Sequence, residues 1–486
     1  METQLFQWFD LRDFRAIVPQ LELTLFACGI LLMDCWLERR HKYLNAMVAL
    51  VGIVFSGVGL WLIRNVNSTA FNRVIIVDSF FIVFSFIFLA ATALVILMSI
   101  RYLEVEGAHE GEYYALMLFA TVGMMFIAGG TDLITLFIGL ELMALSFYVL
   151  VGYLRANRRS NEAAVKYFLL GAFSSGILVY GFSLLYGISG STNINDIAVV
   201  VAQRGLGDPI VFLATITIAA GMFFKVAAVP FHQWAPDVYE GAPTTITAYV
   251  SVASKAAAFA MLVRLFLIPL YPVRANWEDM LAVVAILTMI VGNLAAITQE
   301  NIKRLLAYSS IGHVGYILLG IVAGNKTGLM AVVVYIIVYA FMTLGAFAVV
   351  VGMRRKDLVG DQVSDMAGLF FKNPAPAVLM IIFLLALAGI PPTAGFWGKY
   401  LIFAALIENQ HYVLAVIAAL YVVVALYYYF RIVVSMFITE PREPGKMTLA
   451  PGLAVALAAT CLLTLGLGLY PEPLFHWAQV SVRPFP

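Results

Sequence analysis

The chain alternates apolar stretches of about 20 residues with short segments that are rich in charge, glycine or proline. A helix of that length crosses the hydrocarbon core of a bilayer. The pattern therefore predicts about fourteen membrane-spanning helices, at residues 17–36, 44–63, 76–99, 113–130, 132–153, 164–187, 210–229, 244–268, 280–298, 303–322, 328–352, 376–403, 411–437 and 449–470. The connections between them are short, so we expect no soluble domain on either face.

Two of these stretches are interrupted. The segment PFHQWAPDVYEGAP after Lys225 has three prolines too close together for one continuous helix. The segment AGIPPTAGFWGKY places Pro391 and Pro392 among glycines inside an apolar stretch. Non-helical backbone at membrane depth persists only where protein or water satisfies its polar groups. Paired broken helices in the two halves of a chain are typical of transporters that contain an internal repeat.

Charged side chains lie inside the apolar stretches. Glu141, Lys225 and Lys255 stand within three of them, and Lys399 follows the second break. A charge at a helix centre costs roughly 2.5–3.5 kcal/mol, so four cost about 10–14 kcal/mol, comparable with the net stability of a typical protein. We therefore expect these side chains to be paired or hydrated and to handle ions or protons. His313, also within a span, is either a further proton carrier or a hydrogen bond between helices.

The spacing of these residues indicates a repeat. Lys399 follows Lys225 by 174 residues, and His313 follows Glu141 by 172 residues. The side chains around the matched positions are not similar, so the predicted repeat depends on spacing and charge alone.

Other polar residues have structural interpretations. We expect Asp78 and Asp132 to begin helices, the latter as an N-cap. Lys166 lies near a basic loop and either extends its ammonium to the membrane surface or admits protons. His232, with Trp234 and Asp237, is expected to hold the broken segment together. The tyrosines at 427–429 are interpreted as an aromatic belt at the membrane surface.

Composition agrees with a membrane protein. The chain is 63% hydrophobic and 12% charged, against about 45–50% and about 25% in soluble proteins. A net charge of +1 gives no reason to expect a nucleic-acid partner. Three scattered cysteines form no CxxC set, and no Gly-rich phosphate loop is present, which excludes iron–sulfur, structural zinc and nucleotide sites of the usual kinds.

The distribution of lysine and arginine predicts the orientation. Fifteen of these residues fall in the connections of one side and eight on the other. Cytoplasmic loops carry the excess, so both termini are expected on the periplasmic side. The first residues combine acidic and basic side chains without a small-residue cleavage site, so no cleavable signal peptide is expected. These features favour a bacterial plasma membrane.

Four motifs carry a resemblance to a known family: FIGLELMALSFYVLVGY, GMFFKVAAVPFHQWAPDVYEGAPTTITAYVSVASKAAAF, TQENIKRLLAYSSIGHVGY and LALAGIPPTAGFWGKY. With them the whole chain closely resembles the antiporter-like membrane subunits of respiratory complex I (NADH-quinone oxidoreductase, NDH-1). The best match is the N-type subunit. Three features favour N-type over L- and M-type chains: the motif FHxWxPDVY, a lysine at position 255 and the short tail after the last span.

The resemblance implies an all-α polytopic membrane fold of about fourteen helices, in which two inverted five-helix repeats surround broken helices 7 and 12. The expected divisions are 1–112 (three helices), 113–271 (first repeat), 272–438 (second repeat) and 439–486 (helix 14). It implies a translocase subunit that sits beside M- and K-type subunits in membrane lipid. It also implies no cofactor in this chain, with NADH, FMN, iron–sulfur clusters and quinone held by partner subunits.

The expected site residues are Glu141, Lys225, Lys255, His313 and Lys399, all in proton transfer. We expect Glu141 to gate Lys225, Lys255 to relay laterally with His313 and water, and Lys399 to load or release protons at the far end. The main alternative is a subunit of an Mrp-type cation/proton antiporter, which would use the same charges. A structural membrane spacer, which would tolerate their neutral replacement, is the other.

Overall fold

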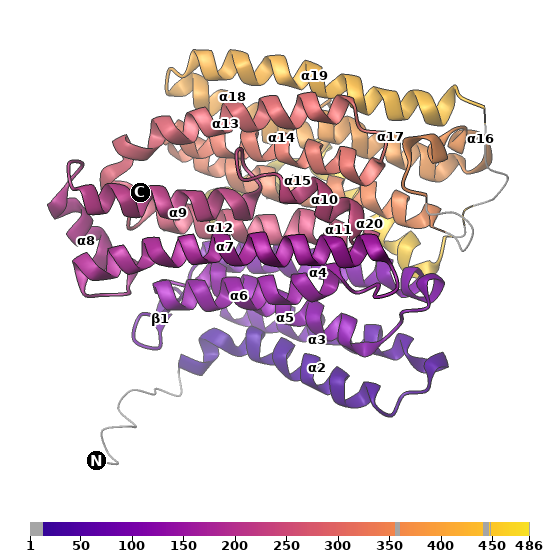
Figure 1. Cartoon of the computed structure of the whole chain (residues 1–486), viewed down its shortest axis with the longest axis horizontal. Coiled ribbons are helices and arrows are strands. Elements are labelled where there is room, and N and C mark those ends of the chain that lie inside the picture. Colours follow the sequence, from indigo (N-terminus) through magenta and orange to yellow (C-terminus); the bar gives the residue numbers. More distant parts are fainter. Residues whose placement is uncertain (1–12, 355–359, 441–446, 448, 486) are drawn as a thin grey trace.

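The computed structural model describes residues 13–354, 360–440, 447 and 449–485 as one bundle of long helices that lie side by side (Figure 1). The α-helices are α2 (Val18–Asp34), α3 (Tyr43–Ile63), α4 (Ser79–Glu106), α5 (Gly111–Gly129), α6 (Leu133–Val151), α7 (Arg158–Ser189), α8 (Ile194–Arg204), α9 (Pro209–Val226), α10 (Trp234–Gly241), α11 (Thr244–Tyr249), α12 (Lys255–Leu267), α13 (Arg274–Ile297), α14 (Ile302–Ala323), α15 (Lys326–Met353), α16 (Leu369–Lys372), α17 (Pro374–Ala388), α18 (Ala394–Glu408), α19 (Tyr412–Phe437), α20 (Pro451–Leu469) and α21 (Glu472–Ser481). The shorter elements are the 3₁₀-helices η2 (Asp13–Ile17), η3 (Arg39–His41), η5 (Tyr271–Val273) and η6 (Val363–Met366), the π-helix η4 (Val250–Ser254), and the strands β1 (Ser68–Ala70) and β2 (Ile75–Val77).

Thirteen helices of the described chain are long and apolar enough to cross a membrane. The fourteenth predicted span, residues 376–403, is divided between α17 and α18, and each half is too short to count alone. The break that the sequence predicted thus accounts for the difference between thirteen and fourteen. The predicted helical, multi-span fold is confirmed, with one short β-hairpin added to it.

The two broken crossings run in opposite directions. Helix α9 begins beside α8 at one end of the bundle, whereas α17 begins beside α16 at the other end (Figure 1). Each first half stops at a left-handed residue, Ala227 with φ 61° and Gly389 with φ 84°. Opposite directions are what an inverted repeat requires. The residue boundaries of the four divisions stay predictions.

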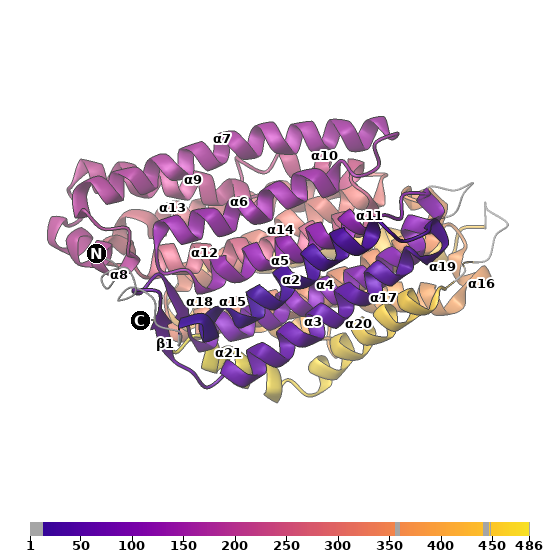
Figure 2. The ribbon, with the colours of Figure 1, turned by 90° about the horizontal axis from the view of Figure 1, so that it is seen from below.

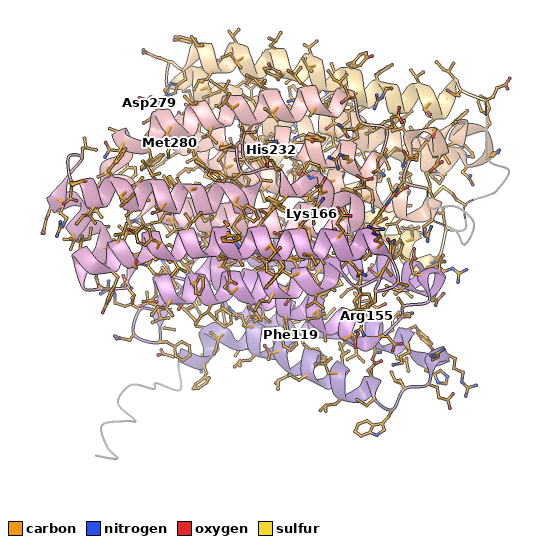
Figure 3. The ribbon with its side chains drawn as sticks, in the orientation of Figure 1. Phe119, Arg155, Lys166, His232, Asp279 and Met280 are labelled. Atoms are coloured by element: carbon orange, nitrogen blue, oxygen red, sulfur yellow. The ribbon has the colours of Figure 1, made fainter. Side chains whose placement is uncertain are left out.

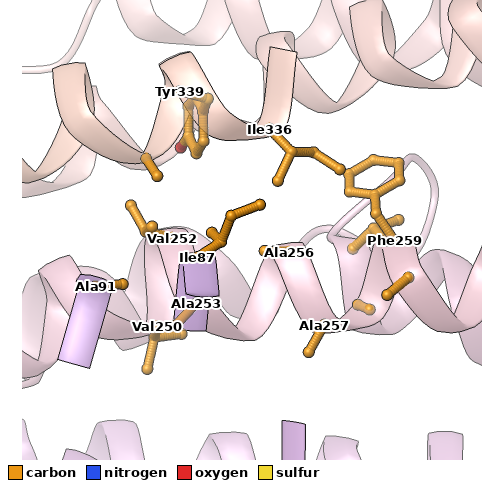
Figure 4. Packing of buried hydrophobic residues seen from close by; sticks show 14 of the residues in the cluster. Ile87, Ala91, Val250, Val252, Ala253, Ala256, Ala257, Phe259, Ile336 and Tyr339 are labelled. Carbon is orange, nitrogen blue, oxygen red and sulfur yellow. The ribbon is translucent and has the colours of Figure 1, made fainter. Parts of the chain in front are cut away.

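The eighth crossing forms the centre of the bundle. It comprises α11, η4 and α12, and its most apolar window is completely buried. Ile87 and Ala91 of α4 pack on one side of it, and Ile336 of α15 packs on the other (Figure 4). The π-helical turn ends immediately before Lys255. Such turns interrupt the regular helix and are frequent at functional sites.

Segments near both chain ends lie at the same end of the bundle, with the β1–β2 hairpin and α8 (Figures 1 and 2). The Ser79 hydroxyl donates to the Val480 carbonyl at 2.7 Å, and the Phe71 amide donates to the Asp13 carboxylate at 2.8 Å. The side of the membrane to which this end belongs stays a prediction. The orientation was predicted from the lysines and arginines of the connections. Five of them lie outside the described residues: Arg12, Arg355, Lys356, Arg442 and Lys446.

Candidate functional site

Glu141, Ser175 and Lys225 form the first group of buried polar side chains. They come from α6, α7 and α9. The Ser175 hydroxyl donates to the Glu141 carboxylate at 2.5 Å, and the Lys225 ammonium donates to the same hydroxyl at 3.1 Å. Serine therefore bridges the acid and the base that the sequence expected to interact. Glu141 is partly buried, whereas Lys225 is 7% exposed.

Lys255 lies at the centre of the second group. Its ammonium donates to the hydroxyl of Ser310 on α14, and the Tyr339 hydroxyl donates to the same oxygen at 2.7 Å. The ammonium also lies 5.7 Å from the centre of the Tyr239 ring, within the range of a cation–π contact. No carboxylate of the described residues pairs with it, so neutral groups alone hold this charge.

His313 lies one helical turn after Ser310 on α14. Its Nδ1 atom is 2.7 Å from the Tyr335 hydroxyl, and its Nε2 atom is 3.1 Å from the Tyr429 hydroxyl. A cavity of about 10 Å³ separates it from Lys255 and touches both residues. A cavity of that size is just sufficient for one water molecule. The proximity of Lys255 and His313 supports the expected lateral relay, although no hydrogen bond joins them directly.

Backbone carbonyls at the second break bind the Lys399 ammonium. Its ammonium donates to the carbonyls of Leu387 at 3.1 Å and Ala388 at 2.8 Å, in the last turn of α17. The break at Gly389 leaves these carbonyls without intrahelical donors. The Tyr316 ring centre lies 5.2 Å from the ammonium. The break thus creates the binding site for the charge that follows it.

The lysine at the first break is held differently. The Phe224 carbonyl accepts from the Trp234 indole at 2.9 Å, and Lys225 turns instead toward α7. Lys225 therefore depends on a side chain of another helix, whereas Lys399 depends on the backbone of the broken helix itself. Trp234 does hold the broken segment together, as predicted, whereas Asp237 pairs with residues of other helices.

The five expected residues therefore lie on helices α6, α9, α12, α14 and α18, and each contacts at least one hydroxyl, carbonyl or aromatic group. The lysines and His313 are all at most 7% exposed. An ammonium held only by neutral groups is costly to bury. A nearby change of charge then alters whether it keeps its proton. We call these five residues the charged row.

Several residues outside the charged row behave as the sequence predicted. The Asp132 carboxylate caps α6 by accepting from the amide of Ile134 at 2.9 Å. Asp78 caps α4 by accepting from the Phe81 amide at 2.7 Å. It also forms a buried ion pair with Arg264 at 3.0 Å, which the sequence did not indicate.

Lys166 lies on the outer helix α7 (Figure 3) and is 42% exposed. It pairs with Glu162 at 2.8 Å and with Asp237 at 2.9 Å. Arg304 of α14 shares the Asp237 carboxylate at 2.7 Å. Lys166 is thus part of a surface ion network. His232 (Figure 3) makes no hydrogen bond through its buried Nδ1 atom in the described structure.

The aromatic-belt interpretation of residues 427–429 is wrong for two of the three. Tyr427 is exposed, but Tyr428 and Tyr429 are buried, and Tyr429 contacts His313 and Ser309. One residue along a helix turns the side chain by about 100°, so adjacent tyrosines face different surroundings. Sequence analysis also missed Ser175. Only Ser310 carried a usable signal, because it stands three residues before His313 on the same helix face.

Among the described residues, no group of three or more histidine, cysteine, aspartate and glutamate side chains is placed to hold a metal ion. The charged row itself offers lysines as its main polar groups, and an ammonium has no lone pair with which to bind a metal.

Comparison with known proteins gives the family. The family model "NADH:quinone oxidoreductase/Mrp antiporter, TM" matches residues 130–425, which include the whole charged row. NADH-quinone oxidoreductase subunit N 2 of Solibacter usitatus is 57% identical over 486 residues, covering 98% of each chain. The chain belongs to the NADH-quinone oxidoreductase subunit N family. Subunit N 1 of Koribacter versatilis is 53% identical and covers 95% of this chain and 93% of its own length.

Solved structures agree with this family. A chain of respiratory complex I from Thermus thermophilus with bound aureothin has a TM-score of 0.80 and 31% identity, covering 94% of this chain and 99% of that chain. A chain of the Mrp complex from Dietzia sp. has a TM-score of 0.83 over 97% of each chain, at 20% identity. The second likeness is one of fold alone. The N-type family and the antiporter fold thus agree with the resemblance found in the sequence motifs.

Proposed function

We propose that this chain carries a proton path through the membrane part of an NADH-quinone oxidoreductase, coupled to quinone reduction elsewhere in that complex. The observation that carries the proposal is the charged row: one partly buried acid, three buried lysines and a buried histidine on five helices. Burying these groups in an apolar bundle costs free energy of folding. Membership of the subunit N family supports the assignment to this complex.

Within the row, Glu141 acts on Lys225 through Ser175. When the Glu141 carboxylate is charged and close, it favours the protonated ammonium, and when it is neutralised or displaced, the ammonium releases its proton more easily. A swing of two to three pKa units corresponds to about 3–4 kcal/mol. Moving one charge against about 150 mV requires about 3.5 kcal/mol. The free energy available from the pKa change is therefore comparable with the work of moving one proton across the membrane.

Lys255 and His313 then relay the proton laterally through the small cavity between them, and Lys399 loads or releases it. Lys399 is suited to this because its partners are backbone carbonyls and an aromatic ring rather than a fixed carboxylate. The assignment of all five residues to proton transfer is part of the proposal.

We further propose the setting of the subunit. It lies in a bacterial cell membrane with both termini on the periplasmic side, beside M- and K-type subunits and lipid. The partner subunits hold NADH, FMN, the iron–sulfur clusters and quinone, and this chain holds no cofactor. The divisions 1–112, 113–271, 272–438 and 439–486 describe three leading helices, two repeats and a last helix.

The Mrp-type alternative is favoured by one observation, the antiporter fold shared with the Dietzia chain. The two functions differ in what drives transport. In an Mrp-type antiporter, proton movement depends on sodium or another cation, whereas in the proposed function it depends on NADH oxidation. Omission of the cation therefore distinguishes them.

The first experiment is proton pumping by membrane vesicles that carry Lys225→Ala, with complex assembly and NADH-driven quinone reduction measured in parallel. We expect pumping and quinone reduction to fall together in an assembled complex. Lys326→Ala is a matched control because Lys326 is exposed at the start of α15. An assembled Lys225→Ala complex that pumps normally would contradict the proposal and favour a structural role.

A further inference from the structure

The step from Lys225 to Lys255 has neither a shared hydroxyl nor a shared cavity in the described structure. Lys225 donates to Ser175, and Lys255 donates to Ser310, but these serines belong to different groups. Glu141 and Lys225 share the Ser175 hydroxyl, and Lys255 and His313 share a cavity, whereas aromatic rings lie between His313 and Lys399. The residues between Lys225 and Lys255 therefore decide whether a proton can pass.

A stack of aromatic rings begins at Phe224, whose ring centre lies 6.0 Å from the Lys225 ammonium. The Trp234 ring lies 5.4 Å from the ring of Phe224, the residue before Lys225. Its other contacts are a parallel stack on Tyr167, with 4.7 Å between centroids, and an edge contact with Tyr239 at 6.4 Å. The Trp234 indole is fixed by its hydrogen bond to the Phe224 carbonyl. The stack is thus continuous and held in place.

The far end of the stack reaches Lys255. The Tyr239 ring centre lies 5.7 Å from the Lys255 ammonium. The Tyr239 hydroxyl lies next to the Ser310 hydroxyl but does not reach the geometry of a full hydrogen bond, although the residue is completely buried. The Tyr167 hydroxyl faces Ser254, which directly precedes Lys255 in the chain. Two hydroxyls of the stack therefore approach the Lys255 region.

The hydroxyls need an explanation beyond packing. Phe224 occupies the same stack without a hydroxyl, so ring contacts alone do not require one. Buried hydroxyls are almost always hydrogen-bonded, and an unpartnered one is unfavourable. A tyrosine hydroxyl can accept a proton on oxygen while it gives up its own. A buried hydroxyl that is only loosely held beside Ser310, the partner of Lys255, has the chemistry that the step needs.

We propose that the hydroxyls of Tyr167 and Tyr239 complete the proton path between Lys225 and Lys255, and this rests on the function proposed above. The Lys225 ammonium loses one proton and becomes an amine. Each hydroxyl oxygen, or a water between them, takes up a proton as its own O–H proton moves on. The Lys255 amine gains one proton and becomes an ammonium. The tyrosines end neutral, and no other bond changes.

The test removes single hydroxyls and keeps the rings. Tyr239→Phe and Tyr167→Phe are measured in vesicles of the assembled complex for NADH-driven pumping, quinone reduction and the ratio of rates in H₂O and D₂O. We expect pumping to fall about tenfold, equivalent to a barrier about 1.4 kcal/mol higher. Quinone reduction should fall with it, and the H₂O/D₂O ratio should rise because proton movement becomes rate-limiting.

Tyr249→Phe is the matched control. Its hydroxyl is equally buried, on the crossing that carries Lys255, but it bonds to Thr92 and Thr121, outside the charged row. Parent-level pumping and an unchanged H₂O/D₂O ratio in both Tyr167→Phe and Tyr239→Phe would overturn the proposal. An equal loss in Tyr249→Phe would also overturn it, since any buried hydroxyl would then have the same effect.

Two further variants cover a failure of assembly and separate the relay from the proposed function. If Tyr239→Phe does not assemble, Ser254→Ala removes the group that faces Tyr167 with a smaller change. Slower pumping with a raised H₂O/D₂O ratio supports the relay, and parent behaviour overturns it. Lys225→Ala separates the two proposals. If it stops pumping while the tyrosine variants pump normally, the relay is wrong and the proposed function stands.

Discussion

The side chain of Lys399 lies directly against the backbone of Gly389. A Cβ atom placed on Gly389 would stand 2.7 Å from Lys399 Cδ, and the glycine has φ 84°, where side chains are strained. We predict that Gly389→Ala displaces the ammonium from its carbonyl partners. The strain is about 1–2 kcal/mol, so the complex should assemble with a lowered melting temperature and strongly reduced pumping.

Gly176→Ala is the control for this variant. Gly176 is within α7, and a Cβ there would meet nothing within 4 Å. Alanine favours helix over glycine by roughly 0.5–1 kcal/mol. That variant should therefore keep its stability and pumping. Normal pumping by Gly389→Ala would show that the position of Lys399 at the break does not matter.

Ser310 is the second test position, because its hydroxyl oxygen accepts from both Lys255 and Tyr339. Ser310→Ala removes this acceptor and leaves the buried ammonium without its hydrogen bond, a penalty of about 1–3 kcal/mol. We predict assembled complex with severalfold lower pumping in vesicles. Ser183→Ala is the control, because it makes the same chemical change at an exposed position. The Ser183 hydroxyl bonds to the nearby Tyr180 carbonyl. This variant should have no effect, and equal losses in both would argue against a specific role for Ser310.

The breaks and the charged row were predictable because both signals are local. Proline and glycine limit the backbone at their own positions, so the interruptions after Lys225 and before Lys399 could be located without a structure. A bilayer makes any enclosed charge expensive, so Glu141, Lys225 and Lys255 stood out from their apolar neighbours. Whether those residues transfer protons remains a prediction.

The partners of the row were not predictable, since they depend on how helices rotate and pack. Ser175 and Tyr335 are common residue types on membrane helices, and nothing near them in the sequence marks them. Tyr429 was misassigned because its exposed neighbour Tyr427 has the same chemistry. The choice between lipid and interior for each tyrosine is set by the rotation of α19 against α13 and α14, which is tertiary information.

The ion pair of Asp78 and Arg264 supports a stability prediction. Both side chains are 1% exposed, and the guanidinium also donates to the Ala128 carbonyl at 2.6 Å. Removing one partner of a buried pair typically costs about 3–5 kcal/mol. Asp78→Asn should therefore prevent assembly or lower the melting temperature of the complex. Neutralising the exposed pair of Arg155 and Glu112 with Glu112→Gln should change stability by at most about 1 kcal/mol.

The double variant Asp78→Leu/Arg264→Met separates charge from packing. It removes both charges and keeps most of the side-chain volume, so it should recover part of the stability lost in Asp78→Asn. Thermal unfolding of the purified complex measures each step. If the double variant is as unstable as the single one, the hydrogen bond to Ala128 and local packing matter more than the uncompensated charge.

Lys166 gives the last prediction, because the sequence left two roles open for it and the structure places it in an exposed ion network. The Lys166 side chain, which pairs with Glu162 and Asp237, is 42% exposed. Exposed ion pairs contribute about 0–1 kcal/mol to the free energy of unfolding. Asp237 keeps Arg304 as a partner when Lys166 is removed. We therefore predict that Lys166→Gln assembles and retains most of its pumping, in contrast to Lys225→Ala. The measurement is NADH-driven pumping at equal amounts of assembled complex, over a range of external pH. A loss as large as that of Lys225→Ala would assign Lys166 to proton entry and would extend the charged row to the membrane surface.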